Sequence, residues 1–306
     1  MAEGSRTLPV IQSGQGSGVP PIFEKVAIVG LGLVGGSIAL ATRKNWPAGL
    51  VIGVDEKDVL EKAMRRHAID VAADDPVVIA EADLVVLAAP VRQNVELLAE
   101  LGEHIHGSAV VTDVSSTKRA VVEAARILPP RLTFVGGHPL AGAPRGGIDY
   151  ARADLFSGRP WLFTPVNDSS GDALDRLSRF VTAFGAKVHM MSADDHDKLL
   201  ASLSHVPQIV ASTLMSIVGD AAGEKGLALA GRGLADTTRL ASSPATIWRD
   251  ICATNTDEIG AALDRLIAEL RTLRSELESE EALDRVFESA GRWRAVLAAK
   301  RGEGVT

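Results

Sequence analysis

The segment that most constrains the fold is a glycine-rich turn between an apolar run and a helical pattern. Residues 25–29 are apolar and β-branched, and residues 30–35 have the pattern Gly-x-Gly-x-x-Gly. The first glycine permits a tight turn, the second leaves room for a pyrophosphate, and the third allows close helix–strand packing. The following helix N-terminus offers free N–H groups to phosphates. The predicted nucleotide-binding turn comprises Gly30, Leu31, Gly32, Leu33, Val34 and Gly35.

An acidic residue stands where a dinucleotide site requires one. Asp55 directly follows the apolar run at 51–54 and lies twenty residues after Gly35. A carboxylate at this position accepts hydrogen bonds from the ribose hydroxyls and repels a 2′-phosphate. We therefore predict NAD as the cofactor, with Lys57 as the nearby cation that would favour NADP instead.

Short apolar runs alternate with helical patterns from Phe23 to about Met190. The runs span residues 25–29, 51–54, 84–88, 109–112, 132–135 and 161–163. This alternation is typical of a parallel sheet covered by helices on both faces, so we predict a Rossmann-like α/β domain. Ligands bind at the carboxyl ends of such strands, which makes Ala89, Pro90 and Asp113 candidate cofactor residues.

Helical patterns replace the strand signal from Ser192 onward. Ser192 and Asp195 form a plausible capping pair before a long apolar-periodic stretch. Two later apolar stripes, within 259–277 and 283–297, are explained either by packing within the chain or by a subunit interface. We predict three parts: a flexible leader at 1–22, a dinucleotide-binding domain at 23–191, and an all-α dimerisation domain at 192–306.

Composition restricts the classes of partner. The 306 residues include 32 Lys and Arg against 39 Asp and Glu, a net charge of −7 that argues against nucleic-acid binding. Cys252 is the single cysteine, which excludes an intrachain disulfide and a thiolate-rich metal site. No uncharged apolar run reaches the roughly 18 residues of a membrane helix, and no secretory signal is evident. We expect no membrane partner and, by default, a cytoplasmic location.

His138 is the histidine best placed for chemistry. It follows the run at 132–135 and two glycines, which let a ligand approach closely. An imidazole there suits removal of a proton from an alcohol while a hydride leaves the same carbon. The alternative is a hydrogen bond that organises the loop. Four other histidines, His67, His104, His106 and His189, lie in polar or edge contexts typical of the surface.

The helical part contributes further candidates. His205 precedes Pro207, which disturbs the helix, and shares a face with Gln208. The alternative for His205 is a hydrogen-bonded core residue. Arg239 stands among hydroxyl residues and could bind a substrate carboxylate through its guanidinium, with a salt bridge as the alternative.

Taken together, these segments resemble the prephenate/arogenate dehydrogenase family of tyrosine biosynthesis. The resemblance extends from about Lys25 to Asn255. The matching segments are Gly30–Ser37, Thr112–Lys118, Gly136–Gly142, Ser204–Pro207 and Arg239–Asp250. Many dehydrogenases share the first segment, whereas the other four are specific in this order and spacing.

The resemblance implies NAD-dependent oxidative decarboxylation of a cyclohexadienol, with no metal and with a homodimer formed through the helical domain. The hydride leaves the ring carbon that bears the hydroxyl, the ring carboxylate departs as CO2, and aromatisation drives the step. By resemblance, His138 accepts the hydroxyl proton and Ser116 bonds the same oxygen. Arg239 would bind a substrate carboxylate. The other implied pocket residues are His205, Gln208, Ser243 and Trp248.

The sequence departs from the family pattern at two places. Ala143 and Pro144 stand where a hydroxyl residue and Glu are common, and Gln208 stands where prephenate-specific members often have a second histidine. Both lie where the substrate side chain would be recognised. The choice between prephenate, a keto acid, and arogenate, an amino acid, therefore stays open.

Two other functions explain part of the sequence. A β-hydroxyacid dehydrogenase of the same two-domain plan would use a lysine in the first helix of the second domain, where Lys198 stands. It leaves the segment Ser204–Pro207 unexplained. A non-catalytic NAD-binding regulator would explain the glycine turn but leaves His138 and Arg239 without a role. We therefore expect an enzyme with a small-molecule substrate.

Overall fold

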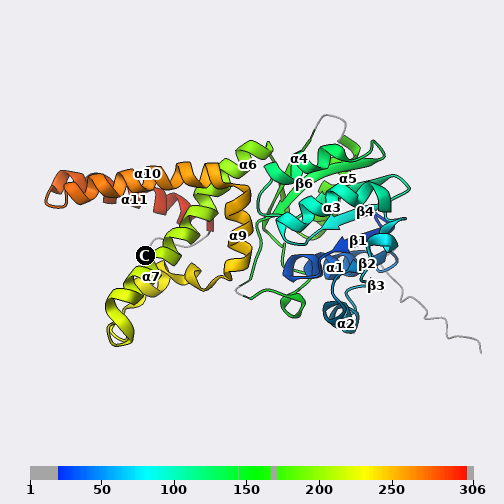
Figure 1. Ribbon diagram of the computed structural model, residues 1–306, viewed down its shortest axis with the longest axis horizontal. Helices are drawn as coiled ribbons and strands as arrows, with labels where there is room; N and C mark the ends of the chain where they lie inside the picture. The colour runs from blue at the N-terminus through cyan, green and yellow to red at the C-terminus, as the bar shows by residue number, and fades with distance from the viewer. Residues whose placement is uncertain (1–19, 144, 167–170, 302–306) are drawn as a thin grey trace, which may run out of the picture. The chain divides into compact units, whose positions relative to one another are not determined.

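The computed structural model describes residues 20–143, 145–166 and 171–301 (Figure 1). The predicted leader lies outside the described residues except for 20–22, and Pro144 also lies outside them. The chain forms two compact units, Met1–Asn255 and Thr256–Thr306. The first contains the sheet and several helices, and the second contains two helices.

The first unit is built on an eight-stranded sheet with the order β3-β2-β1-β4-β5-β6-β7-β8. The strands are β1 (Lys25–Val29), β2 (Leu50–Val54), β3 (Val71–Ala73), β4 (Leu84–Leu87), β5 (Ala109–Asp113), β6 (Leu132–Pro139), β7 (Pro160–Pro165) and β8 (Lys187–Met190). Neighbouring strands are parallel except β6 and β7. This confirms the predicted Rossmann-like domain. The sequence pattern missed β3 and β8 because these short strands are largely exposed and carry no continuous apolar run.

Helices cover both faces of the sheet, as predicted. They are α1 (Leu33–Asn45), α2 (Lys57–Arg65), α3 (Val91–His104), α4 (Arg119–Ala124) and α5 (Gly171–Ala183). Ile38, Leu60 and Phe180 bring α1, α2 and α5 into one core, while Leu98 and Val121 bring α3 and α4 into the other. Each face therefore has its own apolar core, which explains why the central strands are apolar on both sides.

Strand β6 is longer than the sequence predicted, and the difference matters for His138. The apolar run ends at Val135, but the strand continues to Pro139. The reason is antiparallel pairing with β7, in which Gly137 lies opposite Phe163 and His138 opposite Leu162. The expectation that His138 follows a strand is therefore wrong. His138 lies within a paired strand, which fixes its backbone more firmly than a loop would.

The remaining helices of the first unit follow Ser192, whose Oγ accepts the N–H of Asp195 at 3.0 Å. This confirms the predicted helix start. The elements are α6 (Ala193–Leu200), a π-helical turn η5 (Ala201–His205), α7 (Val206–Leu227), α8 (Arg232–Thr237), the 3₁₀ turn η6 (Arg239–Ser242) and α9 (Ala245–Thr254). Pro207 has no N–H to donate to the carbonyl of Leu203, and the widened π turn ends just before it. The predicted local disturbance is thereby confirmed.

The second unit consists of α10 (Thr256–Ser275) and α11 (Glu280–Arg301). Its buried apolar side chains are few, with Ile259 among them, whereas Leu270, Phe287 and Trp293 are exposed. The two apolar stripes are therefore only partly satisfied within the chain.

The stretch Ala193–Leu227 is also long and apolar enough to cross a membrane by length and composition, although only 28% of its most apolar window is buried. Its first half, however, contributes the buried polar residues Asp197, His205 and Gln208 to the first unit. A membrane is thus not needed to explain this helix.

Candidate active site

The glycine turn has the shape that the sequence predicted. Gly30 has φ +93°, and a Cβ there would lie 2.6 Å from the backbone of Ala88 and Ala89. A Cβ on Gly35 would lie 1.9 Å from the carbonyl oxygen of Gly30. By contrast, a Cβ built on Gly32 has no described atom within 4 Å apart from those of its own chain neighbours. Gly30 and Gly35 are therefore required for packing, whereas Gly32 leaves open space beside the turn.

Asp55 lies beside this turn, at the end of β2. Its Oδ2 accepts the N–H of Leu31 at 2.5 Å, and its Oδ1 accepts the N–H of Glu56 at 2.7 Å. The carboxylate is thus fixed next to the opening at Gly32. Helix α1, whose first turn holds Leu33 and Val34, has no acidic residue there to repel a phosphate. The turn, the carboxylate and the helix N-terminus together fit a dinucleotide.

A buried ion pair joins the ends of β5 and β6. Lys118 Nζ pairs with Asp113 Oδ2 and donates to the carbonyl of Gly137 at 2.7 Å, and both charged side chains are fully buried. Asp113 also accepts the N–H groups of Gly137 at 3.0 Å and Ser115 at 2.9 Å. Burial lowers the pKa of Lys118, while Asp113 opposes that shift. Because the Asp113 carboxylate is fully engaged, any contact of Asp113 with a cofactor must come from its backbone.

Ser116 is presented by a loop that is anchored on both sides. Asn94 Nδ2 donates to Ser115 Oγ at 2.9 Å and to the carbonyl of Ala89 at 3.0 Å. Thr117 Oγ1 lies 2.8 Å from Thr254 Oγ1 of α9. Ser116 itself is half-buried, and its hydroxyl has no hydrogen-bond partner among residues that the structure describes. Its hydroxyl is therefore available to a ligand.

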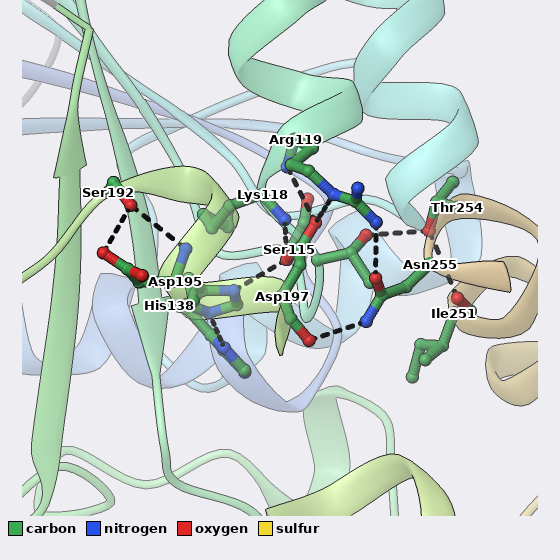
Figure 2. A network of polar contacts seen from close by, with 12 residues as sticks. Ser115, Lys118, Arg119, His138, Ser192, Asp195, Asp197, Ile251, Thr254 and Asn255 are labelled. Atoms are coloured by element: carbon green, nitrogen blue, oxygen red, sulfur yellow. Dashed lines mark hydrogen bonds and ion pairs between the residues drawn. The ribbon is translucent and has the colours of Figure 1, made fainter. Parts of the chain in front are cut away.

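His138 is the end of a buried chain of hydrogen bonds. Its Nδ1 lies 2.9 Å from His196 Nε2, and His196 Nδ1 lies 2.8 Å from Asp197 Oδ1. Figure 2 shows His138 and Asp197 within this network. His196 and Asp197 are fully buried, whereas His138 retains 8% exposure. Within the described part of the chain, Nε2 of His138 has no partner, so it is the nitrogen left for a ligand.

Asp197 collects donors from several elements. It accepts the N–H groups of Lys118 at 2.7 Å and Arg119 at 2.9 Å, and the side chain of Arg119 at 3.4 Å. Asn255 Nδ2 donates to its backbone carbonyl at 2.9 Å. Burial raises the pKa of Asp197, but the hydrogen bonds from His196 and the two backbone groups outweigh it and lower the pKa. Asp197 is therefore a carboxylate at neutral pH.

His138 and His196, the two histidines of this hydrogen-bonded network, are neutral at pH 7. Burial lowers the pKa of His138 well below its usual value, and electrostatic repulsion from the His196, Lys118 and His205 side chains in their protonated forms lowers it further. Burial also lowers the pKa of His196, against the opposing hydrogen bond to Asp197. A neutral imidazole has one nitrogen free to accept a proton, as a general base requires.

His205 is buried beside this chain of residues. Its Nδ1 lies 3.3 Å from Asn255 Nδ2, and its ring meets that of Trp248 edge-on at 6.2 Å between centroids. Burial is the main cause that lowers its pKa to about 4. Since Asn255 donates to Nδ1, the proton of His205 is on Nε2, which is buried and has no partner in the described structure. Unsatisfied buried donors are rare and need an explanation such as a ligand.

Gln208 uses its amide inside the protein. Nε2 donates to the carbonyl of Leu240 at 2.8 Å and to Ser212 Oγ at 3.1 Å, while Oε1 accepts from Ser243 at 3.3 Å. Gln208 therefore joins α7 to η6. Arg239 and Ser243 are exposed on this segment, and the Arg239 guanidinium forms no ion pair with a described residue. The salt-bridge alternative for Arg239 thus finds no partner among those residues.

The structure brings His138 together with two residues that the sequence did not single out. His196 and Asp197 lie in the segment Asp194–Lys198, whose charges are typical of a solvated helix start. Asn255 and Lys118 were likewise not predicted to be site residues. The capping signal at Ser192 fixed the helix start, but which face of its first turn is buried depends on contacts with the distant β5–α4 loop.

The fold and site define a class of protein: a two-domain dehydrogenase with a dinucleotide turn at the end of β1 and an imidazole at the end of β6. Comparison with known proteins gives a more specific result. Residues 38–190 match the family model "Prephenate dehydrogenase, nucleotide-binding domain", and residues 192–289 match "Prephenate dehydrogenase, dimerization domain". The chain belongs to the prephenate dehydrogenase family.

Relatives and solved structures agree with this assignment. The prephenate dehydrogenase of Bacillus subtilis is 37% identical over 89% of this chain and 75% of its own length. The Aquifex aeolicus prephenate dehydrogenase, solved with hydroxyphenyl propionate and NAD+, has a TM-score of 0.82 and 29% identity, covering 89% of this chain and 98% of its own. Synechocystis arogenate dehydrogenase has a TM-score of 0.74 and 29% identity, with coverage of 89% and 99%.

The β-hydroxyacid dehydrogenase alternative loses its support. Its required lysine would be Lys198, which is exposed on α6, whereas the buried residues of that helix are His196, Asp197 and Leu200. The family match across both parts of the chain also explains the segment Ser204–Pro207, which that alternative did not.

The two glycines of the turn predict two different failures. In Gly32→Ala the new methyl meets open space, so the melting temperature should stay within about 2 °C of the wild type while the Kd for NAD+ rises at least about tenfold. In Gly35→Ala the methyl meets the Gly30 carbonyl, so the melting temperature itself should fall. Thermal denaturation and calorimetric NAD+ titration check both variants. Equal behaviour of the two would contradict the assignment of Gly32.

Proposed function

We propose that this protein catalyses the NAD-dependent oxidative decarboxylation of prephenate, of arogenate, or of both, in the formation of tyrosine. The observation that carries the proposal is the neutral, buried His138. Its Nε2 has no partner among the described residues, and it lies near the carboxyl end of β6, in the same sheet as the strand that precedes the glycine turn. Family membership and the names of the relatives support the substrate class.

The order of strands supports a shared site for the dinucleotide and His138. Strand β1, which precedes the glycine turn, is followed across the sheet by β4, β5 and β6. At about 4.8 Å between strands, three steps separate the turn from His138 by roughly 14 Å. An extended dinucleotide lies across this kind of crevice, at the carboxyl ends of the strands.

The residues that would hold NAD are those of the turn, with Asp55 at the ribose and the segment at Ala89 and Pro90 beside Gly30. NAD, when bound, supplies the acceptor for the hydride. The carboxylate of Asp55 has no cationic partner among the described residues, and Lys57 is exposed at the start of α2. This arrangement supports NAD over NADP.

The protein's own residues handle the substrate's polar groups. His138 Nε2 accepts the proton of the ring hydroxyl, and Ser116 hydrogen-bonds the same oxygen from its anchored loop. The Nε2–H of His205 offers an unsatisfied donor to the substrate. Arg239 binds a carboxylate, and Trp248 packs beside His205. Gln208 acts on the site by holding Ser243 and the η6 segment in place.

We also propose that the protein is a homodimer. We place the boundary between its dinucleotide-binding domain and its helical domain between residues 191 and 192. The exposed apolar side chains of α11, Phe287 at 71% and Trp293 at 70%, support a second copy as the partner. The family model that matches 192–289 is that of a dimerization domain. A cytoplasmic location is consistent with a single cysteine, Cys252, that can form no intrachain disulfide.

His138→Asn should lower kcat by about 10²- to 10⁴-fold, the usual contribution of a general base, and leave the Kd for NAD+ unchanged. NADH absorbance with prephenate and with arogenate, measured separately, checks the rate. His67→Asn is the matched control, since His67 is exposed with φ +53° and Asn tolerates that conformation. A wild type inert toward both substrates would refute the proposed function, and a fully active His138→Asn would remove His138 from it.

Arg239→Gln should raise KM about 10- to 100-fold and change kcat much less. The guanidinium–carboxylate contact is present in both ground and transition states, and such a contact contributes about 1.5–3 kcal/mol. Arg126→Gln is the matched control. It removes an exposed arginine whose ion pair among the described residues is with Glu123. Steady-state kinetics with an unchanged KM for Arg239→Gln would show that this residue does not bind substrate.

The double substitution Phe287→Ser and Trp293→Ser should convert a dimer into a monomer. Both side chains are exposed in the single chain, and their burial between copies would be lost. Sedimentation velocity checks the mass. Met190→Ser, which removes an exposed apolar side chain from β8, should leave the dimer intact. A wild-type monomer at micromolar concentration would overturn the proposed assembly.

A further inference from the structure

The residues His196 and Asp197 lie behind His138, away from its free nitrogen. Neither is available to a substrate, since both side chains are fully buried and their ring nitrogens and carboxylate oxygens already have hydrogen-bond partners within the protein. One hydrogen bond joins His138 to His196, and a second joins His196 to Asp197. The Asp197 carboxylate accepts three further hydrogen bonds from the protein. A buried pair of this kind, directly attached to the proposed base, calls for a role of its own.

The donors and acceptors of this chain fix its proton positions. Asp197 is ionised and only accepts, so His196 must donate to it from Nδ1. A neutral His196 then has a lone pair on Nε2, and the contact at 2.9 Å requires His138 to donate from Nδ1. The neutral His138 therefore has its lone pair on Nε2, the nitrogen without a hydrogen-bond partner among the described residues.

We propose that His196 and Asp197 are positioning residues for His138: they fix the tautomer whose Nε2 can accept a proton, and they stabilise the imidazolium that forms when it does. This inference rests on the proposed function. It resembles in logic the way a buried carboxylate orients the histidine of a hydrolase triad, with a second imidazole inserted between the two.

In the proposed reaction, His138 is positively charged only between the loss of the hydroxyl proton and its return, so the imidazolium needs stabilisation only during that interval. The substrate loses a hydride and CO2, and its ring hydroxyl becomes the phenolic hydroxyl of the product, so no net proton is released. The O–H bond breaks as the proton moves to Nε2 of His138. When the C–C bond to the carboxylate breaks, its electron pair enters the ring, and the oxygen takes the proton back. A buried chain that holds the charge is therefore sufficient, and no path to bulk water is needed.

The groups around His138 show why the carboxylate matters. Lys118 Nζ, on the loop after β5, and His205, at the end of η5, both disfavour a positive charge on His138. Asp113 is already paired with Lys118. Asp197 is thus the negative group that is connected to His138 through hydrogen bonds, by way of His196.

Two substitutions of His196 separate this role from simple packing. In His196→Gln, a side-chain oxygen can replace Nε2 as the acceptor, so kcat should stay within about tenfold of the wild type. In His196→Leu the acceptor is gone, and kcat should fall about 10²-fold or more, a large part of a general base's contribution. KM and the Kd for NAD+ should change little in either variant. The loss should be equal at every pH on the neutral plateau, because tautomer populations do not depend on pH.

The tautomer itself can be measured without turnover. In ¹⁵N NMR of the histidine-labelled free protein, His138 should be protonated at Nδ1 in the wild type and in His196→Gln, and should become a mixture in His196→Leu. His189→Leu, at an exposed position on β8, is the matched control and should match the wild type in both kinetics and spectra.

A wild-type His138 protonated at Nε2 would overturn the inference, whether or not the enzyme is active. A His196→Leu variant with wild-type kcat would also overturn it. So would equal losses of kcat in His196→Gln and His196→Leu that are accompanied by a lower melting temperature in both variants. Failure of the proposed function is distinct from these results, because it appears as a wild type that turns over neither substrate.

Discussion

The carboxylate of Asp197 is the group on which the geometry of the site depends. It receives the backbone N–H groups of Lys118 and Arg119, the Arg119 side chain and the imidazole of His196. These contacts join the first helix after the α/β fold to the loop that follows β5. Buried charge is costly unless such donors satisfy it, and four of them do. The helical part and the sheet thus share one fixed point within the first compact unit.

The second constraint is the antiparallel pairing of β6 with β7. It extends β6 through two glycines to His138, so the imidazole projects from a paired strand. A Cβ on Gly137 would lie 2.6 Å from the carbonyl oxygen of Asp113, which shows how closely β5 and β6 approach there. The Lys118–Asp113 pair then joins the same two strand ends. His138 is held by its backbone through the sheet and by its ring through His196.

Much of this could be predicted from local patterns. The glycine turn, Asp55 and six of the strands follow from short-range rules about turns and apolar runs, and the order of the elements then predicts the class of fold. The apolar stripes of α10 and α11 were visible too, but whether they pack inside the chain depends on surfaces that a sequence does not place. The exposure of Phe287 and Trp293 favours the interface.

The inner part of the site could not be predicted in this way. His196 and Asp197 belong to a charged helix start of ordinary composition, and their burial results from donors at positions 118 and 119, far away in the chain. Gln208 stood where a substrate contact was expected, yet its amide is satisfied by Leu240, Ser212 and Ser243. Ser212 is a neighbour on the same helix, but Leu240 and Ser243 are brought to Gln208 by the tertiary structure and leave no local signal.

The central claim is that Nε2 of His138 is the atom that removes the hydroxyl proton. A crystal structure of the protein with NAD+ and hydroxyphenyl propionate, the pair found in the Aquifex relative, tests it most directly. The account predicts a separation of about 2.6–3.2 Å between His138 Nε2 and the phenolic oxygen, with Nδ1 still bonded to His196. A phenolic oxygen bonded to other groups, with His138 Nε2 more than about 5 Å away and no bridging water, would contradict it.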